Sequence, residues 1–394
     1  MTARLTAEQA AHRLGIKTAT LYAYVSRGML QRERTAAGST FDALEVEDFA
    51  ARRRRQPAPD TVRAAGTPLG TIDTDVAVVL DDELFYRGVS ATTLAARASL
   101  PDVARELWQM TEPWPAPDAD DSADVHRAVA ALPAGASTID RLRVAVAVLA
   151  AGDPLRTDGT TAGVCRAGAR MLVHLPHALA AQPTPLPDLW SALSTRPPSE
   201  ADRRALEAAL ILAVDHDLAV STMAARMAAT ARASGYSIVS AALGPFDSPL
   251  HGTAADAARA LLVDVLNGSA PESAVATAVA RAARGVPGFG QPLYSGTDAR
   301  ASALLPLVFA MPGTAELRQA VTAVAAIVQR RIGRYPNLDL ALAAFTLGAQ
   351  MPASAATAVF AIGRIVGWIA HGLAEYTEPA MRLRPRGRYV GPLP

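Results

Sequence analysis

The sequence predicts an all-α protein with a small N-terminal unit and a larger helical body. Alanine is abundant in its 394 residues, and aromatic residues make up only 5% of them. Alanine has the highest helix propensity, whereas strands favour aromatic and β-branched side chains. Helical periodicity dominates beyond the first 60 residues. A chain of this length can bury a large core or form two to three domains.

Charge and cysteine content narrow the functional classes. The 38 basic and 37 acidic residues leave a net charge of +1, so no chain-wide field attracts nucleic acid or an anionic membrane. The one cysteine, Cys165, cannot form an internal disulfide, and residues 1–4 lead into a polar helix pattern rather than an apolar signal core. We therefore expect a cytoplasmic protein.

The longest apolar stretch, residues 355–376, is expected to be a buried helix. Arg364 and His371 lie in its interior. A charged residue at the middle of a bilayer is costly, so we expect no membrane span and no membrane partner.

The N-terminal residues show the pattern of two short helices. Thr6 and Gln9 form a capping-box signature for a first helix that Gly15 ends. Thr18 is expected to cap a second helix, with Gly28 at its end. Two short helices about a tight turn are typical of a helix-turn-helix.

A hairpin and a third helix are expected to follow. Residues 30–34 and 40–41 suit the strands of a small β-wing, and Asp42 can cap a helix that carries Leu44 and Phe49. This order resembles the winged helix-turn-helix of the mercury-resistance-regulator and excisionase type.

That resemblance covers residues 1–56 and makes duplex DNA an expected partner, with the second helix in a major groove. The candidate DNA-binding residues are Lys17, Thr20, Tyr24 and Arg27. Ten basic and six acidic residues give this unit a net charge of 10 − 6 = +4, which suffices for phosphate contacts in a dimer but is low for a repressor. The alternative is a packing domain that binds no DNA.

Residues 57–67 are expected to be a linker. Pro57 and Pro59 lack apolar neighbours at a regular period, and such a segment stiffens a chain without building a core. A linker of this kind predicts few contacts between the N-terminal unit and the body, which should therefore fold without it.

Three separated segments of the body place ionisable residues in apolar, glycine-rich surroundings. They are Asp215–Leu218, Gly244–Gly252 and Pro336–Asp339. Each has an ordinary structural explanation when taken alone. Asp339 could cap a helix, and His216 could cap one or pair with Asp215 or Asp217.

These segments, together with several others in the same order, resemble the citrate synthase family. The matching segments are Phe85–Gly88, Asp215–Leu218, Ser234–Ser237, Gly244–Gly252, Gly285–Tyr294, Pro336–Asp339, Phe360–Arg364 and Arg384–Gly391. The resemblance covers residue 68 to the C-terminus. It implies an all-helical homodimer whose large domain, 68–252 and 353–394, and small domain, 253–352, close over oxaloacetate and an acyl-CoA.

The implied reaction condenses acetyl-CoA, or a slightly longer acyl-CoA, with oxaloacetate or a related 2-keto acid and then hydrolyses the thioester, as in the tricarboxylic acid cycle. A methyl group beside a thioester is a weak carbon acid. A carboxylate must therefore remove its proton while a hydrogen-bond donor stabilises the enolate oxygen. By resemblance Asp339 is the base and His251 is the donor. Acyl-CoA is a substrate, and neither a cofactor nor a metal is expected.

The same resemblance assigns the residues that bind the keto acid, which are His216, Arg300, Arg364 and Arg384. Arginine suits carboxylates because its planar fork donates two parallel hydrogen bonds. Arg384 would reach in from the partner subunit. Arg364 has independent support, because an unpaired guanidinium in an apolar helix would be costly.

The sequence departs from the family at Gln291, where the family has a second catalytic histidine. A glutamine amide can donate a hydrogen bond to the keto oxygen but cannot deliver a proton at neutral pH. Pro292 and Ser295 stand where the family has an arginine and a lysine near the CoA path, and further departures are Ala219, Thr253 and Ala255. The alternative function is therefore a DNA-binding regulator whose body senses a ligand with little or no activity.

Overall fold

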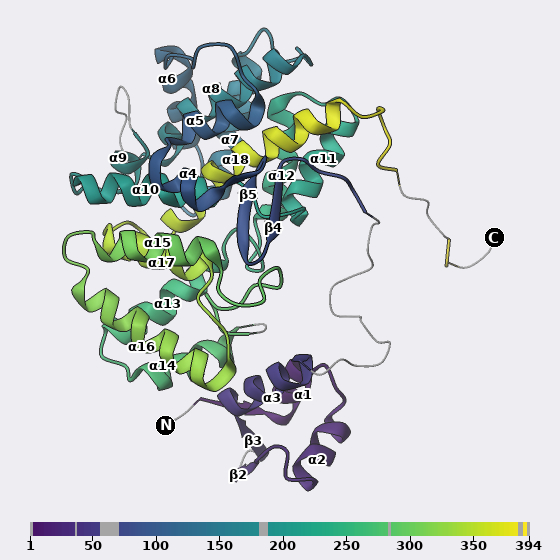
Figure 1. Cartoon of the computed structure of the whole chain (residues 1–394), viewed down its shortest axis with the longest axis vertical. Coiled ribbons are helices and arrows are strands. Elements are labelled where there is room, and N and C mark those ends of the chain that lie inside the picture. The colour runs from purple at the N-terminus through teal and green to yellow at the C-terminus, as the bar shows by residue number, and fades with distance from the viewer. Residues whose placement is uncertain are drawn as a thin grey trace.

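The computed structural model describes residues 3–35, 38–55, 71–180, 188–282, 285–384 and 389–391. Within these ranges the chain forms eighteen helices and two three-stranded sheets. Figure 1 shows three tiers: the N-terminal unit at the bottom, helices α13 to α17 above it, and the other helices of the body at the top. The linker expected at 57–67 lies outside the described residues.

The N-terminal unit forms the three helices and the hairpin that its sequence pattern predicts, together with an additional strand, β1, that was not predicted. In chain order the elements are β1 (Arg4–Thr6), α1 (Ala7–Leu14), α2 (Thr18–Ser26), β2 (Glu33–Thr35), β3 (Gly38–Asp42) and α3 (Ala43–Arg55), with the antiparallel strand order β1-β3-β2. The capping box of Thr6 and Gln9 is present, and Gly15 ends α1 in the left-handed region at φ 64°. Asp42 accepts a hydrogen bond from the Glu45 amide at 2.9 Å, as a cap should.

One expected cap is wrong. Helix α2 begins at Thr18, and the residue in the cap position is Lys17, whose side chain makes no capping hydrogen bond. A lysine side chain has no acceptor for the free amides of a first turn, so this helix depends on packing, with Leu21 fully buried.

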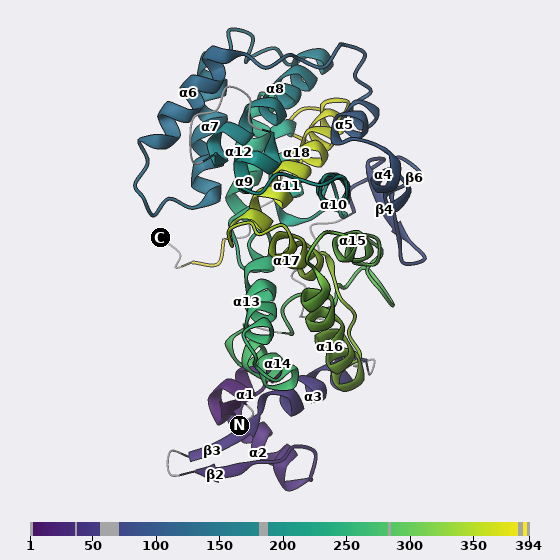
Figure 2. The same ribbon diagram turned by 90° about the vertical axis from the view of Figure 1, so that its left-hand side faces the viewer.

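The N-terminal unit packs against the body, so the expectation of few contacts between them is wrong. Helix α3 contacts α14 (Pro271–Arg281) and α16 (Ala315–Ile332), and Figure 2 shows α1 and α3 directly beneath these two helices. Arg13, whose side chain is 6% exposed, donates through Nη2 to the carbonyl oxygens of Val279 and Ala282, at 2.5 and 2.6 Å, and pairs with Glu47 at 3.4 Å. Carbonyls at a helix C-terminus lack partners inside the helix, so Arg13 stabilises the end of α14.

The body begins with a small antiparallel sheet that the all-α prediction missed. Its strands are β4 (Ala77–Leu80), β5 (Glu83–Tyr86) and β6 (Val89–Ser90). Asp81 and Asp82 form the turn between β4 and β5 with φ of 51° and 62°. Such turns usually carry Asn-Gly or Asp-Gly, so Asp-Asp gave no hairpin signal.

The top tier surrounds one central helix, α18 (Ala355–Tyr376). Its other helices are α4 (Ala91–Arg97), α5 (Leu100–Trp108), α6 (Ala119–Ala130), α7 (Thr138–Gly152), α8 (Thr161–Leu179), α9 (Leu189–Leu193), α10 (Glu200–Leu212), α11 (Val220–Thr230) and α12 (Gly235–Phe246). Among the described helices only α18 is long and apolar enough to cross a membrane, and its apolar window is entirely buried inside the protein. This agrees with the buried helix predicted for 355–376.

Two glycines let α18 approach the main chain that follows α10. A Cβ atom at Gly363 would clash with the carbonyl oxygen of Leu210, and one at Gly367 with that of Val214. Only a residue without a side chain allows this close approach. The contact brings Arg364 beside residues 213–215.

The middle tier consists of α13 (Ala254–Leu266), α14, α15 (Ala299–Phe309), α16 and α17 (Leu338–Gly348). A β-bridge between Phe289 and Pro336 joins the segment that precedes α15 to the segment that precedes α17. The starts of α15 and α17 therefore lie together next to the top tier, where α15 contacts α10 and α17 contacts α18.

Candidate active site

A cavity of about 320 Å³ lies where the middle and top tiers meet. It is lined by six of the seven body residues that the sequence analysis singled out: His216, His251, Gln291, Arg300, Asp339 and Arg364. They come from the segments after α10 and α12, the segment before α15, and helices α15, α17 and α18. Tertiary packing thus brings together side chains that are up to 148 positions apart (364 − 216).

Asp339 lies in the first turn of α17, but it does not cap this helix. Asn337 does so, because its Oδ1 accepts hydrogen bonds from the amides of Asp339 and Leu340 at 3.0 and 3.4 Å. The Asp339 carboxylate is left to line the cavity. Burial raises its pKa to about 6, although the nearby Arg300 opposes this shift.

Two hydrogen bonds to the backbone of Gly290 hold the segments of Gln291 and Asp339 at the same wall. The Gly290 amide donates to the Tyr335 carbonyl at 2.9 Å, and Asn337 Nδ2 donates to the Gly290 carbonyl at 3.0 Å. Gln291 Oε1 accepts a hydrogen bond from the Leu293 amide at 3.4 Å. This bond leaves the amide nitrogen of Gln291 as its donor group.

His251 faces the cavity from a turn that follows α12. Its Nε2 lies 2.7 Å from Ser221 Oγ, which also accepts a hydrogen bond from Trp368 Nε1 at 3.2 Å. Burial, with a further contribution from Arg364, lowers the pKa of His251 to about 4, so the ring is neutral at pH 7. When Ser221 donates its hydroxyl proton to Nε2, the ring proton resides on Nδ1. A Cβ at the adjacent Gly252 would clash with Phe246, which explains the glycine in this turn.

The two cavity arginines differ in how they are held. Arg300 makes a two-point ion pair with Asp298, Nε to Oδ1 at 3.0 Å and Nη2 to Oδ2 at 2.8 Å. Burial disfavours its charge, but Asp298 more than offsets this, and the pKa of Arg300 is raised. Asp298 Oδ2 also accepts the Leu338 amide at 3.2 Å, so the same carboxylate ties α15 to α17.

Arg364 retains an unsatisfied donor. Its Nε donates to the Ala213 carbonyl at 2.7 Å, and its Nη1 lies 3.7 Å from Asp215 Oδ1 without a hydrogen-bond partner among the described residues. Burial lowers the pKa of Arg364, and the charge of Arg300 adds to this effect. A buried N–H group that lacks an acceptor is costly, so this arginine is suited to bind an anion.

His216 packs on Tyr294 and does not pair with an acidic side chain. Its Nε2 lies 3.1 Å from the Tyr294 hydroxyl, and its backbone amide donates to Asp215 Oδ1 at 2.8 Å. The carboxylate of Asp215 pairs instead with His371 at 2.6 Å. Burial is the main reason that the pKa of His216 lies well below its ordinary value, and the positive charges of Arg300 and Arg364 lower it further.

Pro292 and Ser295, which stand where the family has basic residues near the CoA path, make different contacts in this structure. Pro292 lines the cavity, and Ser295 donates to Asp82 from its amide at 2.6 Å and from its hydroxyl at 2.8 Å. These hydrogen bonds lower the pKa of Asp82 at the tip of the β4–β5 turn, and the bond from the Ser295 amide has the largest effect. Of the other departures, Ala219 lines the cavity and Ala255 is buried in α13.

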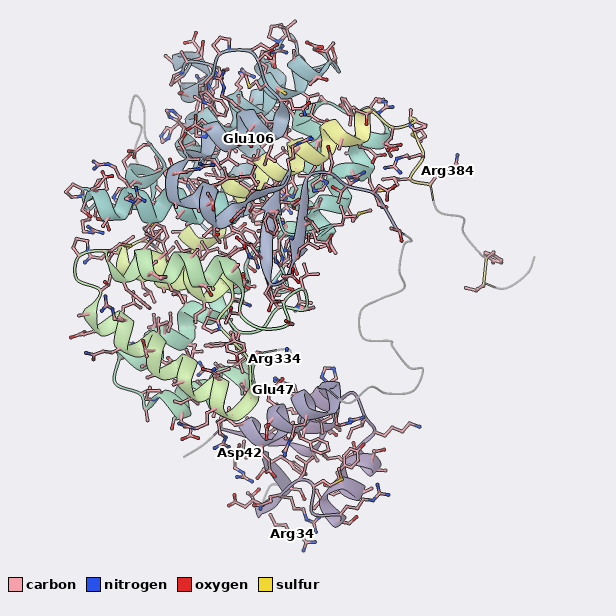
Figure 3. The ribbon with its side chains drawn as sticks, viewed as in Figure 1. Arg34, Asp42, Glu47, Glu106, Arg334 and Arg384 are labelled. Carbon is pink, nitrogen blue, oxygen red and sulfur yellow. The ribbon has the colours of Figure 1, made fainter. Side chains whose placement is uncertain are left out.

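Arg384 lies away from this cavity. It is exposed in the segment that follows α18, and Figure 3 shows it beyond the edge of the body. The cavity of this chain therefore forms without it.

The four candidate DNA-binding residues differ in their exposure. Lys17 and Arg27 are exposed, whereas Thr20 and Tyr24 are half-buried. The Tyr24 ring lies 5.2 Å from that of Phe49 on α3. The exposed Tyr22, which the sequence analysis overlooked, lies on the outer face with the Arg32 guanidinium 5.8 Å from its ring centre.

The sequence analysis also missed Ser221, Tyr294 and Asp298 as partners of cavity residues. Ser221 lies five positions after His216, and Asp298 lies two positions before Arg300. For Ser221 and Asp298 nearness in sequence was the signal, whereas Tyr294 ends the matching segment Gly285–Tyr294. Within the described part of the chain, no cluster of three histidine, cysteine or acidic side chains could hold a metal ion.

The chain is similar to known proteins both in sequence and in fold. The family model described as citrate synthase, C-terminal domain, matches residues 60–386. A citrate synthase from Saccharolobus solfataricus is 32% identical over 205 residues, 50% of this chain and 54% of that protein, so this match spans about half the relative's length. A 2-methylcitrate synthase from Mycobacterium tuberculosis is 28% identical over 358 residues, covering 83% of this chain and 89% of that protein.

Solved structures show the same fold. A citrate synthase from Thermoplasma acidophilum superposes with a TM-score of 0.69 at 24% identity, covering 82% of this chain and 95% of that one. A citrate synthase from Pyrobaculum aerophilum gives a TM-score of 0.67 at 21% identity, covering 92% of this chain and 95% of that one.

The raised pKa of Asp339 predicts a pH-dependent cost in stability. In the unfolded chain Asp339 ionises near its ordinary pKa of 3.8, whereas in the folded protein it holds its proton up to about pH 6. The unfolded state therefore binds fewer protons between these values, and folding stability falls as pH rises through this window. We expect Asp339→Asn to raise the melting temperature at pH 7 to 8, and the gain to disappear near pH 4. A gain of equal size at both pH values would contradict the raised pKa.

Proposed function

Since this chain belongs to the citrate synthase family, we propose that it is an acyltransferase that condenses acetyl-CoA, or a short acyl-CoA, with oxaloacetate or a related 2-keto acid and then hydrolyses the thioester. The observation that carries this proposal is the placement of Asp339 and His251 in one cavity with Arg300 and Arg364. The Thermoplasma acidophilum relative was solved in a ternary complex with carboxymethyl coenzyme A and oxaloacetate. The large domain is 68–252 with 353–394, and the small domain is 253–352.

Asp339 serves as the base. A pKa of about 6 leaves its carboxylate ionised at neutral pH, yet makes it a stronger proton acceptor than an exposed aspartate. It removes a proton from the carbon next to the thioester. No hydrogen-bond donor among the described side chains occupies its carboxylate, so its oxygens are available to the substrate.

His251 serves as the donor to the thioester oxygen. Its low pKa keeps the ring neutral, and the contact of Nε2 with Ser221 leaves Nδ1 as the N–H group. A fixed neutral donor stabilises the enolate oxygen as negative charge develops there. The new carbon–carbon bond then forms between the enolate carbon and the keto carbon of the second substrate.

The keto acid binds on the side of the cavity formed by His216, Arg300 and Arg364. Both arginines are buried, and Arg364 has an N–H group without an acceptor among the described residues. A substrate carboxylate would satisfy that group and balance the local positive charge. The Gln291 amide donates to the keto oxygen in place of an imidazole.

The acyl-CoA side is apolar. Leu250 lines the cavity with 71% of its surface exposed, and Leu293 lies nearby on the opposite segment. With Pro292 and Ser295 in place of basic residues, apolar contact contributes more to recognition of the acyl arm than charge does. The Mycobacterium tuberculosis relative is a 2-methylcitrate synthase, so a chain longer than acetyl belongs in the substrate panel.

A matched pair of variants tests the mechanism. Asp339→Asn removes the base but keeps its shape, and we expect it to lower turnover by roughly 100- to 10,000-fold with little change in keto-acid binding. Asp217→Asn removes an exposed carboxylate from the same cavity and should retain activity. CoA release measured over a panel of acyl-CoAs and keto acids provides the readout. Full activity of Asp339→Asn would exclude it as the base.

Gln291→His tests how far the site matches the family. One well-placed donor to a developing oxyanion changes the rate on the order of a hundredfold, and an imidazole can also carry charge. We therefore expect Gln291→His to raise turnover with oxaloacetate and acetyl-CoA. If the rate falls while another keto acid proves the better substrate of the unaltered protein, the pocket has been rebuilt around glutamine.

We propose further that the protein is a homodimer, joined through α11. Val220 and Met227 lie two turns apart on this helix and are 61% and 43% exposed. An exposed apolar stripe on a body helix is typical of a subunit contact. A dimer would also bring Arg384 within reach of the partner's cavity. Light scattering during gel filtration should give twice the 41.0 kDa chain mass, and a monomer would contradict this arrangement.

A second function, DNA binding by the N-terminal unit, is favoured by exposed basic residues on and near α2. Lys17 and Arg27 are exposed at the two ends of this helix, and the exposed Arg32, just before β2, lies over the ring of Tyr22. In this proposal residues 1–56 form a winged helix-turn-helix, and the body acts as a ligand sensor of low activity. We expect duplex DNA to bind with a strong salt dependence that Lys17→Ala with Arg27→Ala reduces. Absence of binding at low salt would leave the unit a packing role only.

A further inference from the structure

A continuous chain of ionisable side chains runs from the cavity to the C-terminal segment. Its members are, in spatial order, Arg364, Asp215, His371, Arg226, Glu375 and Arg382. The first five are each at most 1% exposed. Of these six residues, only Arg364 lines the cavity and binds the keto acid in the proposed function. The burial of the other four buried residues therefore requires another explanation.

The first half of this chain fixes the two residues that face the keto acid. Asp215 Oδ1 accepts the His216 amide at 2.8 Å and faces Arg364 Nη1 at 3.7 Å. Asp215 Oδ2 is held by His371 Nε2 at 2.6 Å. Burial alone would raise the pKa of Asp215, but the hydrogen bond from His371 and the charge of Arg364 hold it below its ordinary value. The orientation of this carboxylate thus sets the positions of Arg364 and His216.

The contacts of His371 determine where its proton resides. Arg226 Nη1 lies 3.2 Å from His371 Nδ1, and a guanidinium can only donate hydrogen bonds. Nδ1 must therefore accept, so the ring is neutral and its proton is on Nε2. From there it donates to Asp215. The contact with Arg226 thus favours the tautomer of His371 that donates to Asp215.

The second half of the chain reaches the C-terminal segment. Arg226 Nη2 pairs with Glu375 Oε2 at 2.9 Å. Glu375 also receives two hydrogen bonds from Arg382, Nε to Oε1 and Nη2 to Oε2, each at 2.8 Å. Arg382 lies beyond the end of α18, two residues before Arg384, and its side chain is 26% exposed.

We propose that His371 and Arg226 are positioning residues of the keto-acid site, and that Arg382 joins the C-terminal segment to the same network. This inference rests on the proposed function, which supplies a dicarboxylate as the ligand of Arg364. His371 and Arg226 keep the Asp215 carboxylate turned toward Arg364 and the His216 amide. In the dimer, the segment that carries Arg384 toward the partner's cavity is anchored by the network of its own cavity.

Variants of His371 with a buried histidine as control test the first half of the chain. His371→Leu removes both hydrogen bonds, whereas His371→Gln retains one donor and one acceptor. His174 is also buried and lies 3.0 Å from the Ser122 hydroxyl and 3.6 Å from Asp121, but it does not line the cavity. His174→Leu therefore reproduces the loss of a buried, bonded histidine elsewhere.

The expected result is a selective loss of keto-acid affinity. We expect His371→Leu to raise the KM for the keto acid, and its Kd by calorimetry, by roughly tenfold or more, with the KM for acyl-CoA unchanged. His371→Gln should recover most of this loss. His174→Leu should lower the melting temperature without changing keto-acid affinity. Equal losses in His371→Leu and His174→Leu, or no loss in either, would overturn the positioning role.

Arg382 is tested against Arg232, which holds the same segment without joining the network. Arg232 donates to the backbone carbonyls of Glu375 and Glu378. We expect Arg382→Gln to weaken keto-acid binding and Arg232→Gln to leave it unchanged. Equal effects of the two variants would mean that the segment acts by its position alone, and the link through Glu375 would be wrong.

A spectroscopic readout separates this inference from the proposed function. If the unaltered protein neither condenses nor binds any keto acid of the panel, the proposed function fails. The network can still be judged from ¹⁵N-labelled histidine, because NMR distinguishes the two ring tautomers. We expect a neutral His371 ring protonated on Nε2, and a change in its nitrogen shifts in Arg226→Met. A ring protonated on Nδ1, or no change in Arg226→Met, would overturn the network.

Discussion

The carboxylate of Asp215 is completely buried, and the arrangement of the cavity depends on it. One oxygen orients the His216 amide and faces Arg364, and the other is held by His371. A lone buried charge would be too costly to retain, so these partners are required by the presence of the carboxylate. They can meet only because Gly363 and Gly367 let α18 lie against the main chain that follows α10. A packing constraint on backbone therefore sets the geometry of the charges.

Burial then gives the ionisable residues of the cavity different protonation states. It raises the pKa of Asp339 to about 6 and lowers that of His251 to about 4, because exclusion of water disfavours the charged form of each. At neutral pH this yields an ionised base and a neutral donor in one cavity. A carbon acid as weak as an acyl thioester needs both groups at once.

The departures from the family reach the cavity at Gln291 and also change the edges of the site. Ser295 holds the tip of the β4–β5 turn through Asp82, in a position where the resemblance predicted a lysine. A long cationic side chain is thus replaced by a serine, whose hydrogen bonds join the segment before α15 to the β4–β5 turn. At the far end of the molecule, Arg13 fastens the N-terminal unit to α14, so movement of α14 would carry that unit with it.

The sequence alone determined the helical class, the family and the seven candidate residues of the body, because these depend on composition and on motifs whose order survives in the chain. It also located the helices of the N-terminal unit, since caps such as Thr6 with Gln9 act over three or four residues. Only the tertiary structure decided that Asn337, and not Asp339, caps α17, that Tyr24 packs inward while Tyr22 faces out, and that His371 reaches Asp215 across 156 positions. When two nearby residues both suit a local role, such as capping a helix, the surrounding packing decides which of them takes it. A contact between residues far apart in the chain leaves no pattern in the local sequence. The tertiary structure also decided the pKa values of Asp339 and His251, because burial, which shifts both of them, is a property of the whole fold.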